Sequence, residues 1–213
     1  MQKHYFTTPR TARYFTLGNP GAETIWFVCH GYGQLAEYFI KNFDGLDLQK
    51  NFIVAPEALS RFYLEGFSGR VGATWMTKEE RVPEINDHIN YLNSLYELFL
   101  KKRTEVRINI LGFSQGVPAV CRWVAHGKVK FDKLILWAGI FPPDLNTDFS
   151  FTVENLLKDK LTYIVYGKQD QFLKEEHLSE IEKFKLIKPD LNVLIYEGKH
   201  EINKAILKKI SDE

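Results

Sequence analysis

The chain has 213 residues, of which 45% are hydrophobic and 26% charged. These proportions are ordinary for a globular protein, and the length suits one domain with its own core, so we expect a single domain over residues 1–213. The formal net charge is +1 and the lysines are dispersed, which argues against a nucleic-acid partner.

Both cysteines, Cys29 and Cys121, lie in apolar segments. We expect two buried free thiols, because a disulfide framework does not suit this length and cysteine count. The first ten residues lack the apolar core of a secretory signal, and no apolar run approaches the length that spans a bilayer. We therefore expect a cytoplasmic protein without stable membrane insertion.

The first elements along the chain are short strands. Residues 4–8 and 12–18 alternate polar and apolar positions, which is typical of an antiparallel pair. Residues 24–31 and 51–57 are continuous apolar runs, which predict strands buried on both faces. A short helix is expected between them, over residues 35–43.

Residues 57–81 are rich in aromatics and glycine without a clear period. We expect a long irregular connection with a functional role, because long loops in compact domains are usually functional or disordered and the aromatic content argues against disorder. Pro83 then opens a long helix. Its predicted apolar stripe recurs every three or four residues, at Ile85, Ile89, Leu92, Tyr96 and Phe99.

The rest of the chain alternates strands with helices. Strands are expected over residues 106–112, 133–139, 161–167 and 192–198, and helices over residues 117–127, 174–186 and the C-terminal segment. Buried strands that alternate with helices predict one α/β domain with a mostly parallel sheet.

A serine, an acid and a histidine each follow one of these strands. Ser114 lies in Gly-Phe-Ser-Gln-Gly, Asp170 follows the 161–167 strand, and His200 follows the last strand. Ligands of open α/β sheets bind outside the carboxyl ends of the strands. The chain order Ser, Asp, His is that of an α/β-hydrolase.

The residue types suit nucleophilic catalysis. A serine hydroxyl needs a base, which the imidazole of His200 can supply near neutral pH. Asp170 would hold that ring in the required tautomer. The developing oxyanion needs backbone N–H donors, for which Gln115 follows the nucleophile and Tyr32 lies between two glycines.

Alternatives exist for two members of the triad. His177 is the alternative base, although it lies within a helical pattern, and Asp144 and Asp148 are alternative acids after the preceding strand. His30 is expected to be a structural hydrogen-bonding residue beneath the oxyanion loop. We expect no metal and no cofactor, because no cluster has metal-ligand spacing and the Gly31–Gly33 loop lacks the lysine of a phosphate loop.

Four segments together resemble a known family. "FVCHGYG", "LGFSQGVPAV", "VYGKQDQF" and "YEGKHEI" are similar to the phospholipase/carboxylesterase family of the α/β-hydrolase superfamily, which includes acyl-protein thioesterases. The resemblance runs from about Thr24 to the C-terminus. Gln115 after the serine is its most specific element, whereas Gln34 stands where the family usually has an acid, and Pro118 where it usually has a small residue.

The resemblance implies an α/β-hydrolase fold with helices on both faces of the sheet and no large cap domain. It implies a serine hydrolase that cleaves carboxylic esters or thioesters through an acyl-enzyme, without metal or cofactor. By motif, the triad positions fall on Ser114, Asp170 and His200, and the oxyanion positions on Tyr32 and Gln115.

The substrate pocket is predicted from aromatics near these motifs. Phe67, Trp75 and Met76 of the long connection and Phe141 are expected to line it, unless they only pack the loop onto the core. An exposed aromatic loop would also suit a homodimer. The alternative functions are a peptidase or amidase on the same triad and a non-catalytic binding protein on a hydrolase scaffold.

Overall fold

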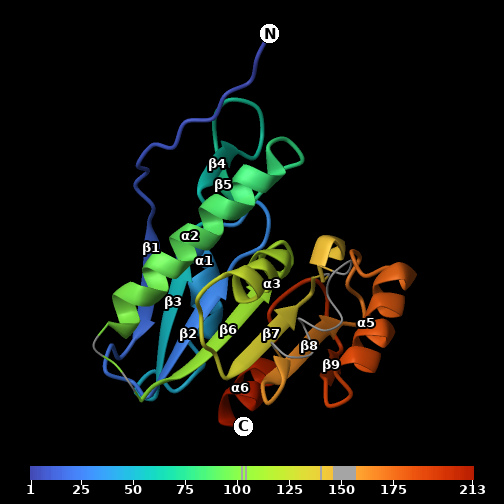
Figure 1. The fold of residues 1–213 in the computed structure, drawn as a ribbon. Helices are drawn as coiled ribbons and strands as arrows, with labels where there is room; N and C mark the ends of the chain where they lie inside the picture. Colours follow the sequence, from blue (N-terminus) through green and yellow to red (C-terminus); the bar gives the residue numbers. More distant parts are fainter. Residues whose placement is uncertain (102, 104, 140, 146–156) are drawn as a thin grey trace.

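A seven-stranded sheet forms the centre of the computed structural model (Figure 1). In spatial order its strands are β1 (Tyr14–Gly18), β3 (Asn51–Pro56), β2 (Thr24–Cys29), β6 (Arg107–Phe113), β7 (Lys133–Trp137), β8 (Leu161–Gly167) and β9 (Asn192–Tyr196). The structure describes every residue except 102, 104, 140 and 146–156. All pairings are parallel except that of β1 with β3, so the predicted mostly parallel sheet is confirmed.

Helices cover both faces of this sheet. They are α1 (Ala36–Phe39) with the 3-10 turn η1 (Ile40–Phe43), α2 (Arg81–Leu100), α3 (Gly116–His126), α5 (Glu175–Ile187) and α6 (Lys204–Asp212). A second 3-10 turn, η2, spans Pro143–Leu145.

Alternate side chains of β2 divide the core in two. Phe27 and Cys29 pack with α2, α3 and α5 on one side, whereas Trp26 and Val28 pack with α1, η1 and α6 on the other. A strand buried on both faces reads as a continuous apolar run, because neither of its two side-chain rows meets water. The predicted stripe of α2 is also confirmed, since its apolar residues belong to the first of these clusters.

The antiparallel strand at the N-terminal edge has a different partner from the predicted one. Residues 4–8 form no strand and are exposed, and β1 pairs instead with β3, with Tyr14 opposite Pro56. This pairing packs Phe15 and Leu17 against the core. A local pair outside the sheet would have left both side chains without that packing.

The predicted irregular connection contains a β-hairpin. Strands β4 (Ser60–Tyr63) and β5 (Val71–Thr74) pair in antiparallel fashion within residues 57–81. Gly66 and Gly69 in its turn have positive φ angles, a conformation that glycine adopts without steric cost. The hairpin joins the rest of the fold through its second strand, because Gly33 N–H donates to Ala73 O at 2.9 Å.

No helix in the described part of the chain is long and apolar enough to cross a membrane. Cys29 and Cys121 are free and buried, as the sequence predicts.

Burial raises the pKa of both Cys29 and Cys121, so neither should form a reactive thiolate in the folded protein. We expect Ellman's reagent at pH 8 to modify neither thiol until guanidinium unfolds the chain, after which both react. Glutathione gives the control rate of an accessible thiol. Modification of the folded protein at that rate would contradict the burial of one cysteine.

Candidate active site

A sharp turn carries Ser114 at the carboxyl end of β6. Its φ angle of 53° is in the left-handed region. Residues other than glycine rarely adopt this conformation, which costs them roughly 1–2 kcal/mol. Two backbone hydrogen bonds hold the turn, from Ser114 N–H to Trp137 O at 2.8 Å and from Val117 N–H to Ser114 O at 3.0 Å. The turn directs the backbone from the strand straight into α3.

The glycine after the serine permits a close approach of two chain segments. A Cβ atom at Gly116 would overlap the carbonyl oxygen of Cys29 at the end of β2. Glycine at this position therefore lets the start of α3 lie against the neighbouring strand, which explains why the serine is followed two residues later by glycine.

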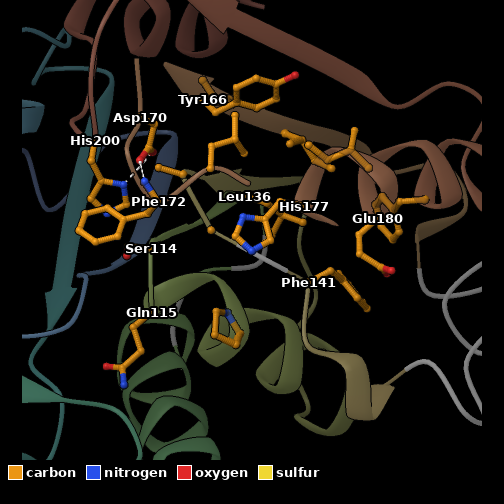
Figure 2. A pocket seen from close by; sticks show the side chains of 18 residues that line it. Ser114, Gln115, Leu136, Phe141, Tyr166, Asp170, Phe172, His177, Glu180 and His200 are labelled. Atoms are coloured by element: carbon orange, nitrogen blue, oxygen red, sulfur yellow. Dashed lines mark hydrogen bonds and ion pairs between the residues drawn. The ribbon is translucent and has the colours of Figure 1, made fainter. Parts of the chain in front are cut away.

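Asp170 and His200 meet at the ends of β8 and β9. His200 Nδ1–H donates to Asp170 Oδ2 at 2.7 Å (Figure 2). Phe172 N–H donates to the other carboxylate oxygen at 2.9 Å, and only 2% of the Asp170 side chain is exposed. An ionised carboxylate can only accept, so the proton lies on Nδ1 and the lone pair of Nε2 is free to take a proton.

Two aromatic rings flank the imidazole of His200. The ring centroid of Phe113 lies 4.9 Å from that of His200, and the ring of Phe172 lies 4.7 Å away in an edge-on arrangement. These contacts restrict the ring rotation that the Asp170 hydrogen bond already limits.

Of the two alternative acids, Asp144 is paired with another residue. Asp144 forms a two-point ion pair with the buried Arg122, at 3.0 and 2.5 Å, and this hydrogen bonding lowers the pKa of Asp144. Asp148 lies outside the described residues. The alternative base, His177, lies on α5 and faces the same cavity as Ser114, but it makes no contact with Asp170 among the described residues.

In the loop after β2, the N–H groups on both sides of Tyr32 donate hydrogen bonds within the protein. Gly31 N–H donates to the side chain of Gln34 at 2.8 Å, and Gly33 N–H donates to Ala73 O. In the described part of the chain, the N–H groups of Tyr32 and Gln115 make no turn or loop hydrogen bond. Both are thus available to a ligand oxygen, and Gln34 Oε1 supplies the acceptor for Gly31 N–H that a carboxylate at this position could also supply.

One segment, Thr74–Met76, forms hydrogen bonds with both Gln115 and the residue before the loop after β2, and we call it the clamp. Trp75 N–H donates to Gln115 Oε1 at 3.1 Å, and Gln115 Nε2–H donates to Met76 O at 2.9 Å. The indole Nε1–H of Trp75 donates to His30 O at 2.8 Å, directly before the loop. The side chain of Gln115 therefore lies in this clamp, whereas its backbone N–H remains available.

His30 supports the same loop from below. Its ring is fully buried and bonds Gly31 O through Nδ1 at 2.8 Å, while Nε2 accepts from Ala58 N–H at 3.1 Å. The structural role expected for His30 is thus observed.

A cavity of about 270 Å³ opens beside Ser114 and His200, between α3 and α5 (Figure 2). Its apolar lining comes from Leu136, Phe141, Ile164, Leu173, Ile181 and Phe184. Of the four predicted pocket residues, only Phe141 lines it. No group of three or more acidic, histidine or cysteine side chains among the described residues could hold a metal ion.

The predictions for Phe67, Trp75 and Met76 are corrected by the structure. Phe67 lies in the hairpin turn and is 96% exposed, whereas Trp75 and Met76 are buried beneath the oxyanion loop. Aromatic composition predicted that this segment lies near the site, but not whether its side chains line the cavity or pack into the core. The sequence predicted the helix α5 but not that its apolar residues line the cavity, because a half-exposed amphipathic helix has no pattern that identifies its inner face as the wall of a binding site.

The fold was compared with known proteins. No family model and no curated protein sequence matches the chain. An acyl-protein thioesterase 2 from Zea mays superposes with a TM-score of 0.73 at 16% identity, covering 95% of this chain and 97% of the other. A phospholipase/carboxylesterase from Dyadobacter fermentans superposes with a TM-score of 0.66 at 16% identity, covering 97% of both chains.

The chain has the α/β-hydrolase fold. A carboxylesterase from Bacillus cereus is also similar, with a TM-score of 0.62 at 11% identity over 94% of this chain and 92% of the other. The similar structures thus include proteins of the type that the sequence motifs resemble.

Because the clamp residue Trp75 bonds both candidate oxyanion segments, Trp75→Phe should lower kcat for ester hydrolysis about tenfold and leave KM nearly unchanged, through loss of the indole bond to His30 O. Trp26→Phe is the matched control, since the buried Trp26 Nε1–H donates to Asn51 Oδ1 at 2.8 Å away from the site. Steady-state kinetics on both variants tests this, and an equal loss of kcat in the two would contradict it.

Burial lowers the pKa of both His30 and His88 to about 4, whereas an unfolded histidine titrates near 6.5. Between about pH 6.5 and 4 the unfolded chain binds more protons, so the free energy of unfolding should fall as the pH falls and level off below about pH 4. His88→Phe should reduce this slope by up to about 1.4 kcal/mol per pH unit. Urea unfolding at pH 7 and pH 5 measures it, and His126→Phe, an exposed position, should leave the slope unchanged.

Proposed function

We propose that the chain is a serine hydrolase that cleaves carboxylic esters or thioesters through an acyl-enzyme on Ser114. The observation that carries this proposal is the serine on its strained turn, facing one cavity with a histidine whose Nδ1–H is held at 2.7 Å by a buried aspartate. The fold and the names of the similar structures support it.

In the proposed reaction His200 Nε2 takes the proton of Ser114 as Oγ attacks the carbonyl carbon. Asp170 stabilises the imidazolium that forms. The N–H groups of Tyr32 and Gln115 bind the oxygen on which negative charge develops. The imidazolium then protonates the leaving alcohol or thiol, which departs and leaves the acyl group on Ser114.

A water molecule completes the cycle. His200 takes its proton as the water attacks the acyl-enzyme, and returns that proton to Ser114 as the carboxylic acid leaves. Each of these steps uses side chains and backbone groups of this chain, so we propose that the reaction needs no cofactor.

The cavity favours small esters over peptides. Its volume of about 270 Å³ is near the lower end of the range for small-molecule sites, and it is lined mainly by apolar side chains. An extended peptide would need a longer groove with backbone partners, so a peptidase or amidase remains the less favoured alternative. The homodimer expected from the aromatic loop stays a prediction.

Ser114→Ala should lower kcat for p-nitrophenyl esters by several orders of magnitude, because loss of the triad serine costs about 10⁶-fold in subtilisin. The assay covers acyl chains from acetate to dodecanoate. Ser94→Ala is the matched control, as Ser94 is exposed on α2 and donates to Asn90 O on the same helix. Turnover by Ser114→Ala within tenfold of the wild type would refute the proposed nucleophile, and a fluorophosphonate probe should label the wild type but not this variant.

A further inference from the structure

The α5 wall of the cavity carries two polar side chains that the proposed mechanism does not use. His177 and Glu180 lie in the lining together with Ile181 and Phe184. Figure 2 shows both across the cavity from Ser114 and His200. Polar groups in a mainly apolar site usually fix the orientation of a ligand.

His177 offers a hydrogen-bond donor to the cavity. Its Nδ1 accepts the N–H of Lys174 at 3.0 Å, which caps the start of α5. In the neutral ring the proton must then lie on Nε2. Its ion-pair neighbour among the described residues, Glu176 Oε1, lies 3.6 Å from Nε2, beyond hydrogen-bond reach. Only 13% of the His177 side chain is exposed, and the residue lines the cavity, so a ligand bound there can replace the water at this donor.

Glu180 offers an acceptor one helical turn further on. Residues three apart on a helix lie on the same side, with about 5–6 Å between their Cβ atoms. Oε1 of Glu180 binds Lys183 Nζ at 2.7 Å, which leaves Oε2 for another donor. The side chain is 36% exposed.

We propose that the ester cleaved at Ser114 carries a hydroxyl group, which accepts from His177 Nε2–H and donates to Glu180 in this cavity. This inference rests on the proposed function. A hydroxyl group satisfies both side chains, because it is donor and acceptor at once. A carboxylate would meet the like charge of Glu180, and an ammonium would leave the His177 donor unsatisfied.

The hydroxyl can lie on either side of the ester bond, and matched substrates distinguish the two cases. Ethyl 3-hydroxybutanoate against ethyl butanoate places it on the acyl side. Glyceryl monobutanoate against propyl butanoate places it on the alcohol side. We expect one of the hydroxylated esters to show about tenfold higher kcat/KM than its partner, the effect of one or two hydrogen bonds at a partly exposed site. A pH-stat measures all four.

Variants of the α5 wall test the assignment. His177→Phe should remove the preference, measured as the ratio of kcat/KM for the hydroxylated ester to kcat/KM for the plain ester. His177→Gln should retain much of the preference, because glutamine at this position of a capping box also accepts the Lys174 N–H and keeps a donor. Glu180→Leu should reduce the preference, whereas Glu182→Leu, on the exposed side of the same helix, should not.

The outcomes separate the two proposals. If no ester is cleaved, or if Ser114→Ala retains activity, the proposed function fails. If plain and hydroxylated esters react equally in the wild type while Ser114→Ala is inactive, the hydroxyl inference fails and the function stands. An equal loss on both esters in His177→Phe, with a lowered melting temperature, would assign His177 to helix capping alone and overturn the inference.

Discussion

The close contact between the end of β2 and the start of α3 determines the geometry of the candidate site. Gly116 lies directly against the Cys29 carbonyl, so the chain must turn sharply at Ser114 and adopt a φ angle that a serine rarely has. The same contact brings the loop that follows β2 next to the serine. Ser114 and the loop after β2 are thereby placed by backbone packing at the end of the sheet, without reliance on a flexible side chain.

The second support comes from outside the sheet. Thr74–Met76, at the end of the hairpin, exchanges hydrogen bonds with Gln115 and with the carbonyl of His30. Both candidate oxyanion donors therefore depend on one short segment that is distant from them in sequence. Because its side chains are buried, this segment fixes the site through satisfied hydrogen bonds rather than by lining the cavity.

Local sequence patterns predicted most of the fold and the three residues proposed as a triad, which line one cavity. The buried strands are apolar runs, and Ser114, Asp170 and His200 follow three strand ends, so their convergence follows from a parallel sheet. The partner of β1, the hairpin and the role of Trp75 depend on which surfaces meet in the folded chain. Alternation in residues 4–18 indicates a strand but not its partner. An aromatic residue such as Trp75 suits a pocket and a core equally well.

The turn of the β4–β5 hairpin is exposed, whereas the strand that follows it is hydrogen-bonded to the rest of the fold. A side chain added at Gly66 or Gly69 would meet no atom within 4 Å, and Phe67 between them extends into solvent. A few residues later, Ala73 is hydrogen-bonded to the loop after β2. Extra residues at this turn would lengthen it without shifting the site. The fold thus has an anchored position beside the candidate site at which evolution or design can add a cap, and so change which ligands reach Ser114 without moving the residues around it.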